Sequence, residues 1–485
     1  MDRLSALDAS FLYLEDSSTP MNVGGVAIFR PPAEGFDHER LVALIRRRIA
    51  FVPRYRQRIR EVPLGVSRPV WVDDEDFDVT FHVRRSALPR PGTREQLDEL
   101  VGRLMSRPLD RSRPMWEMYL VEGLEDGCFA VITKSHQSLV DGLAAVDIAQ
   151  VMLDTSPDAS LGPPDVWQPR PEPSGAELLS AALTEAIARP AAAVDLAKET
   201  WHDVTSAAGS VGAFAFKAVG TISGAVTSVL RSPSQSPLST RIGAHRRFAS
   251  LTIPLEEIRG IRKASGGTIN DAVLAVITGG LRGWLMARGE AVTQGRALRA
   301  LVPVSVEGAP LPGAGSASTT NQVAGFLVDL PVGEPDPIMR LRQISFHLAS
   351  LKQSERFIGA EAIVSIAGFG PPTLHALGSR VGASLSRRAY DLSVTNVPGP
   401  QQPLYVAGSQ MVEAYPCIPL LQGQALSIGV TSYYGVVCIG LTSDRDSMPD
   451  VDILMSSIHD AVDELREAAT VGRRTLRSVA DEESA

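Results

Sequence analysis

The sequence contains only three cysteines, Cys128, Cys417 and Cys438, and they lie far apart in the chain. Three scattered cysteines supply neither a disulfide framework nor a zinc site, which favours a reduced, cytosolic setting. The net charge is −8, whereas a nucleic-acid-binding domain is strongly basic, so nucleic acid is not an expected partner. Residues 1–8 contain no apolar run, and we therefore predict no secretion signal.

The chain is long enough to bury more than one core, with 485 residues of which 44% are hydrophobic. At roughly 150 residues per domain, the length indicates about three domains or two large ones. The sequence predicts two α/β units, over 1–155 and 239–470, with no visible internal repeat. Between them, 156–238 contains proline-rich linkers and a helical crossover, and the charged tail 471–485 is expected to be disordered.

Within the crossover, residues 204–230 carry a single charge, Lys217, among many small residues. This stretch is long enough to span a bilayer, but a lysine at its middle and its mixed polarity disfavour that reading. Two alternatives stay open. In the first, the stretch is a helix that packs on the protein or serves as a mobile connection between the two units. In the second, it contacts a lipid surface.

The first unit carries a run of arginines on and after a predicted helix near 36–60. Such a run is usually a solvated helix face. It is also suited to CoA phosphates or anionic lipid headgroups. The arginines are Arg46, Arg47, Arg48, Arg54, Arg56, Arg58 and Arg60.

The most informative stretch is 134–142, which reads K-S-H-Q-S-L-V-D-G. An apolar, strand-like run over 128–133 precedes it and a helix-like run over 143–153 follows, so His136 is predicted at a strand-to-helix corner. Histidine suits a general base because its free pKa lies near neutrality. Asp141 adds a carboxylate five residues on, and Gly142 allows the backbone to turn without a Cβ clash.

This stretch and five others resemble, in the same order along the chain, motifs of the bacterial wax ester synthase/diacylglycerol acyltransferase family. That family belongs to the CoA-dependent acyltransferase superfamily, whose signature is H-H-x-x-x-D-G. The six motifs here are the opening L-D-A-x-F and P-M-x-V-G, Pro114-Met115-Trp116, H-Q-x-x-x-D-G from His136, Asn270-Asp271, Thr395-Asn396-Val397-Pro398-Gly399-Pro400, and a closing hairpin near Tyr434-Gly435.

The resemblance implies an α/β fold of two chloramphenicol-acetyltransferase-like domains, mixed sheets flanked by helices, with a tunnel between the halves. It implies an O-acyltransferase that moves a long-chain acyl group from acyl-CoA to diacylglycerol, in triacylglycerol synthesis, or to a long-chain alcohol, giving a wax ester. No cofactor or metal is implied, because acyl-CoA is a substrate. We expect a cytoplasmic monomer or homodimer, peripherally associated with a membrane or lipid-droplet surface.

The catalytic residues implied by the resemblance are His136, Gln137 and Asp141, with Gly142 structural. In the family the second histidine is the base, and here that position is Gln137, which cannot accept a proton near neutral pH. In one interpretation the corner is irregular and His136 acts as base. In another, Gln137 holds the hydroxyl while solvent or CoA takes the proton. In a third, the protein binds acyl-CoA or neutral lipid with little or no turnover.

Asp141 is expected to shape the corner by pairing with an arginine or with backbone amides, and a role as second proton carrier is the weaker alternative. The resemblance also implies substrate contacts from Asn270, Thr395 and Asn396, which offer donors for an oxyanion. For Asn270-Asp271 a structural alternative has equal weight, because Thr268 is a plausible helix N-cap with Asp271 three residues on.

Overall fold

The computed structural model describes residues 2–140, 148–158, 166–188, 236–306, 322–353, 358–359 and 390–483, and the account below concerns these residues. The described part of the first half alternates short strands and helices around one six-stranded sheet and one three-stranded sheet. Its elements are β1 (Asp2–Arg3), α1 (Ala6–Leu14), β2 (Asn22–Arg30), α2 (His38–Arg48), η1 (Ile49–Phe51), η2 (Pro53–Arg56), β3 (Gln57–Arg60), η3 (Pro63–Gly65), β4 (Val70–Asp73), α3 (Val79–His82), β5 (Val83–Ala87), α4 (Arg94–Met105), β6 (Trp116–Glu122), η4 (Glu125–Gly127), β7 (Phe129–His136), α5 (Ile148–Val151) and α6 (Gly175–Ala188).

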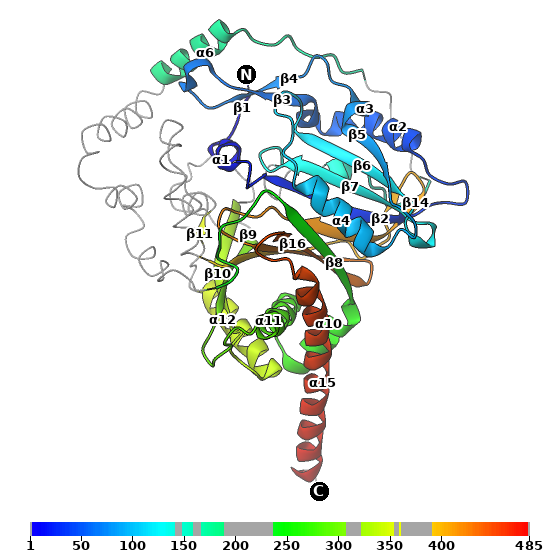
Figure 1. Ribbon diagram of the computed structural model, residues 1–485, viewed down its shortest axis with the longest axis vertical. Helices are drawn as coiled ribbons and strands as arrows, with labels where there is room; N and C mark the ends of the chain where they lie inside the picture. The colour runs from blue at the N-terminus through cyan, green and yellow to red at the C-terminus, as the bar shows by residue number, and fades with distance from the viewer. Residues whose placement is uncertain are drawn as a thin grey trace, which may run out of the picture.

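The second half forms a seven-stranded sheet with four helices grouped on one side of it, as Figure 1 shows. Its elements are β8 (Arg246–Pro254), α10 (Leu255–Ser265), α11 (Ile269–Ala287), β9 (Leu298–Val306), β10 (Gln322–Leu330), α12 (Pro337–Gln353), β11 (Ile358–Gly359), β12 (Leu392–Pro398), β13 (Tyr405–Val406), β14 (Ser409–Cys417), β15 (Leu426–Tyr433), β16 (Val436–Asp444) and α15 (Val451–Glu483).

Both large sheets are mixed, as the family resemblance implied. The first has the order β13-β14-β2-β7-β6-β5 with β5 parallel to β6, and the second has the order β11-β10-β9-β12-β15-β16-β8 with β12 parallel to both neighbours. The segment 405–417 follows β12 in the chain, yet β14 pairs with β2 in the first sheet. The second half therefore completes the first sheet, which ties the two halves together by a backbone ladder.

A second tie between the halves is α4, which lies along the outer edge of β8. Ser106 Oγ accepts from the backbone N–H of Arg246 at 2.8 Å, and the Asp98 carboxylate accepts from the backbone N–H of Ser250 at 2.9 Å. Asp98 is buried, and that burial raises its pKa to about 7, against the lowering effect of the Ser250 hydrogen bonds. These side chains satisfy edge-strand N–H groups that would otherwise be left unpaired.

The last helix continues into the predicted tail. We expected the second unit to end near 470 and the tail 471–485 to be disordered, whereas α15 continues to Glu483 and projects away from the body in Figure 1. The extension contains one glycine, Gly472, and no proline, so nothing in its sequence stops helix propagation. The prediction of disorder rested on charge alone. Among the described residues, no helix is long and apolar enough to cross a membrane.

The close approach of α4 to β8 predicts opposite effects for two helical glycines. A Cβ at Gly102 would lie 2.9 Å from the Arg246 carbonyl oxygen and 3.3 Å from the Phe248 nitrogen, both backbone atoms. Gly102→Ala should therefore destabilise the protein by on the order of 1–3 kcal/mol. Gly260→Ala in α10 meets nothing within 4 Å and should stabilise by about 0.5–1 kcal/mol. Urea unfolding measures both, and equal effects would contradict this packing.

Candidate active site

His136 is the last residue of β7, where the strand is still regular. Its backbone N–H donates to the Met115 carbonyl at 2.9 Å on one side, and it lies opposite Asn22 of β2 on the other. Along β7, Phe129 and Val131 face the core below α2, while Ala130 and Ile132 face α4. This alternation directs Lys134 and His136 toward the α4 side of the sheet.

The imidazole of His136 is held by its own turn. Its Nδ1 accepts from the backbone N–H of Ser138 at 3.1 Å and lies 2.6 Å from Ser138 Oγ. Because a backbone N–H can only donate, Nδ1 is the acceptor nitrogen, and the neutral ring therefore carries its proton on Nε2. Ser138 has a role here that the sequence motif did not suggest.

Glu15, at the end of α1, faces the other side of the ring. Its Oε2 lies 3.7 Å from His136 Nε2 and accepts from Arg111 at 2.8 Å. Its Oε1 accepts from the Met21 N–H at 3.2 Å. No sequence motif marked Glu15. It lies 121 positions before His136 in the chain and comes close to it only in the folded protein.

Burial dominates the ionisation of this site. His136 has no exposed surface, its Nε2 has no hydrogen-bond partner among the described residues, and burial lowers its pKa to about 4. Glu15 acts in the opposite direction and Arg111 adds to the lowering. His136 is consequently neutral at physiological pH. To act as a base toward a substrate, its ring would have to leave Ser138 and Glu15.

Gln137 is the first residue of the turn that follows β7. Its backbone N–H donates to the Met21 carbonyl at 2.8 Å, and its side chain is half-buried. A strand residue at this position would face the side that carries Ser135 and Trp116, but in the turn the register does not fix the direction of the Gln137 side chain. Asp141 and Gly142 lie outside the described residues, so their predicted roles stay predictions.

The structure brings Asn270 and Asn396 together. Asn270 is the second residue of α11 and its Oδ1 accepts from Asn396 Nδ2 of β12 at 2.8 Å. The neighbouring Asp271 forms the reciprocal capping box with Thr268, so the structural interpretation holds for that residue. The two residues of this motif therefore have separate tasks, with Asp271 starting the helix and Asn270 fixing the end of β12.

Thr395 lies on the other face of β12. It is paired in register with Gly429 of β15, so the two share a face. A Cβ at Gly429 would lie 2.7 Å from Pro416 of β14, which shows that this face packs against the first sheet. Thr395 is half-buried at that junction, whereas Asn396 is on the helix side.

Most of the arginine run is paired within the protein. Arg58 and Arg60 both contact Glu172, and Arg56 stacks on Trp167 with 4.8 Å to the ring centroid. Arg48 binds Asp154 at 2.6 Å, and Arg54 binds Asp2 at 2.7 Å. Glu172, in the proline-rich linker after the first unit, therefore neutralises part of a patch that is also suited to CoA phosphates.

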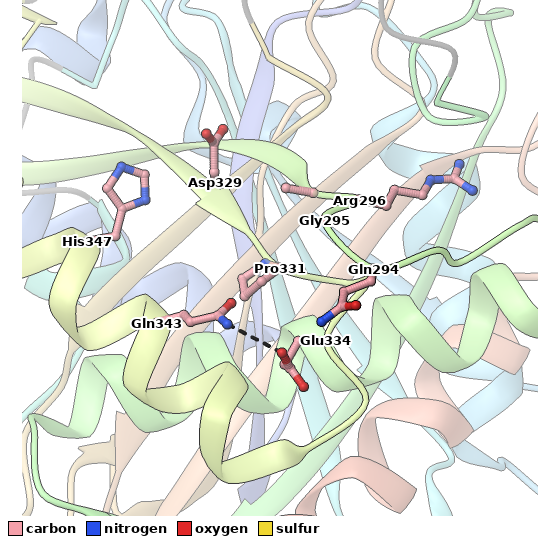
Figure 2. Close-up of a pocket in the computed structure, with 9 residues that line it drawn as sticks. Gln294, Gly295, Arg296, Asp329, Pro331, Glu334, Gln343 and His347 are labelled. Atoms are coloured by element: carbon pink, nitrogen blue, oxygen red, sulfur yellow. Dashed lines mark hydrogen bonds between the residues drawn. The ribbon is translucent and has the colours of Figure 1, made fainter.

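A cleft of about 400 Å³ lies on the second half, between β10 and α12 (Figure 2). It shares no residue with the site predicted from sequence. Two of its charged side chains form ion pairs within the protein, Asp329 with Arg299 and Arg296 with Glu290. We do not assign it to the acyl-transfer chemistry. Within the described ranges, no group of three or more His, Cys, Asp or Glu side chains is placed to hold a metal ion.

The buried histidine predicts a pH dependence of stability. The folded-state pKa of His136 is about 4, while an unfolded histidine titrates near 6.5, so the unfolded chain binds more protons between these values. Stability is therefore lost as pH falls from about 6.5 toward about 4. His136→Asn, whose Oδ1 can still accept from Ser138, should remove up to about 1.4 kcal/mol per pH unit of this slope.

Urea unfolding at several pH values across this range measures the slope. His459→Asn is the matched control, because this side chain is 71% exposed and burial is the cause invoked for His136. An unchanged slope in His136→Asn would contradict a buried, neutral ring.

Comparisons with known proteins agree with this architecture. The model of the wax ester synthase/diacylglycerol acyltransferase catalytic domain matches residues 4–273, and that of the WS/DGAT C-terminal domain matches residues 319–466. A probable diacylglycerol O-acyltransferase, tgs2 of Mycobacterium tuberculosis, is 32% identical over 97% of this chain and its own full length. A second, tgs3, is 43% identical over 54% of this chain and 95% of its own.

Solved structures extend the comparison. The wax ester synthase/diacylglycerol acyltransferase from Marinobacter aquaeolei VT8 superposes with a TM-score of 0.70 at 29% identity, covering 97% of this chain and all of that one. The first condensation domain of the CDA synthetase shares the fold alone, with a TM-score of 0.53 at 15% identity over 96% of each chain. The chain therefore belongs to the wax ester synthase/diacylglycerol acyltransferase family.

Proposed function

We propose that this protein transfers a long-chain acyl group from acyl-CoA to the free hydroxyl of diacylglycerol, with a long-chain alcohol as second acceptor. The observation that carries the proposal is the match over the whole length of a relative named a probable diacylglycerol O-acyltransferase. The match to the Marinobacter enzyme supports the wax ester activity as well.

In the proposed reaction, the Gln137 side chain hydrogen-bonds the acceptor hydroxyl, and His136 stabilises the turn through its hydrogen bond to Ser138. Three observations support this division: Gln137 is half-buried in the turn beside His136, the His136 ring is fully buried, and its pKa is about 4. An amide can orient a hydroxyl but cannot take its proton. The proton passes to solvent or to the departing CoA sulfur, so turnover is slow compared with a site that has a positioned base.

We propose Thr395 as a donor to the oxyanion that forms on the thioester carbonyl. Its position on the junction face of β12 supports this role, because a substrate held between the two halves would lie there. Asn270 and Asn396 then act by fixing the end of β12 through their mutual hydrogen bond. Asp141 would shape the corner beside Gln137, and Gly142 would allow its turn.

We place the reaction at a membrane or lipid-droplet surface on the cytoplasmic side, because diacylglycerol and long-chain alcohols partition into lipid. The purified protein, as monomer or homodimer, should release free CoA from palmitoyl-CoA only when diolein or hexadecanol is added, measured with a thiol reagent and by lipid chromatography. Palmitoyl-CoA without acceptor is the control. Acyl-CoA binding without CoA release would instead identify a catalytically inactive lipid-binding protein.

The variant Gln137→His tests the division of roles directly. It restores the base that the family has at this position, and a positioned base contributes ~10²–10⁴ in rate, so kcat should rise within that range. Gln137→Asn is the matched control, since it keeps an amide and adds no base, and it should give no gain. Steady-state kinetics with diolein measures both. An unchanged kcat in Gln137→His, with the variant folded, would contradict a missing base at 137.

A further inference from the structure

The loop between β3 and β4 holds two apolar side chains in solvent. Leu64 is 89% exposed and Val66 is 48% exposed. Leu64 has a left-handed backbone, with φ of 65°, and Gly65 follows with φ of 63°. A left-handed backbone is unfavourable for leucine, and here the strain is not offset by burial of the side chain. The stability of the fold therefore does not explain a leucine at this position.

Helix α6, which packs at the base of this loop, carries a third exposed apolar side chain. Leu178 and Ala182 of α6 pack against Val62 and Val70 at the base of the loop, so the helix is anchored there. The next residue, Leu183, is 59% exposed. We call Leu64, Val66 and Leu183 the apolar tip. Figure 1 shows α6 beside β3 and β4 at the end of the molecule opposite the projecting end of α15.

Arginines stand on both sides of the loop in the sequence. Arg60 precedes the loop and is exposed although it contacts Glu172, while the exposed Arg68 ends it and donates to the Leu4 carbonyl at 2.8 Å. Arg3 donates to Ser67 Oγ at 2.6 Å. Glu61 is the acidic residue within the loop itself. Guanidinium groups bind phosphate oxygens well, so these arginines are suited to the phosphates of lipid headgroups.

We propose that the apolar tip is the surface by which this protein docks on a phospholipid layer. Leu64, Val66 and Leu183 enter the boundary between headgroups and acyl chains, and Arg60 and Arg68 lie at the phosphates. Three exposed apolar side chains are enough to enter a lipid surface, whereas a stable protein partner requires about 800 Å² on each side. The inference rests on the proposed function, in which the acceptor alcohol resides in lipid.

Flotation with vesicles of phosphatidylcholine and phosphatidylglycerol tests the proposal on the full chain. The variant Leu64→Asn/Val66→Thr/Leu183→Gln should bind about tenfold more weakly than wild type. Each change preserves local structure, because asparagine tolerates the left-handed region, threonine matches valine in shape and glutamine favours helix. Phe346→Gln is the matched control, since this side chain on α12 is 79% exposed in the other half and should not affect binding.

Circular dichroism should be unchanged in the triple variant, and its midpoint of thermal unfolding should be no lower than that of wild type. The proposal is overturned if wild type does not float, if the triple variant floats equally well, or if Phe346→Gln loses as much binding. Turnover of palmitoyl-CoA with dihexanoylglycerol dispersed as monomers separates the two proposals. There, wild type and the triple variant should be equally active. If both are inactive but only wild type floats, the enzymatic proposal fails and the docking surface stands.

Discussion

The strict alternation of β7 up to its last residue is the constraint on which the site depends. β7 is paired with β2 as far as His136 and with β6 as far as Ser135, so the side of the sheet that His136 faces is fixed. His136 faces the junction of α1, the end of α4 and the turn at Ser138, where Glu15 and Arg111 complete a buried polar cluster. Gln137 follows as the first residue of the turn, with its backbone N–H bonded to the Met21 carbonyl. In the proposed reaction, the residue that holds the corner and the residue that meets the acceptor are therefore neighbours at the end of one strand.

The same principle of fixed faces organises the second half. On β12, Asn396 binds Asn270 at the start of α11, while Thr395 faces the first sheet through the register with Gly429. Two contacts join the halves at that junction. β14 pairs with β2 in the first sheet, and side chains at α4 accept hydrogen bonds from the backbone of β8. The spatial relation between Thr395 and the β7 corner is therefore set by the interlocking of the halves.

Much of the fold was predictable from sequence, because its signals are local. An apolar run placed a strand over 128–133, where β7 lies, and Tyr434-Gly435 forms the predicted hairpin turn with positive φ at both residues. The capping box of Thr268 and Asp271 was also readable. The entry of β14 into the first sheet was not, since no local pattern specifies which sheet a strand joins. Glu15 was missed for the same reason. The end of α15 was expected to be disordered because its sequence is rich in charged residues.

The central claim is that Gln137, and not His136, meets the acceptor alcohol. The most direct measurement is a crystal structure of the protein with a non-hydrolysable acyl-CoA analogue and a bound long-chain alcohol. The account predicts the alcohol oxygen within hydrogen-bond distance of the Gln137 amide, with the His136 ring still on Ser138 and facing Glu15. An alcohol oxygen hydrogen-bonded to a His136 ring that has swung away from Ser138 would contradict it.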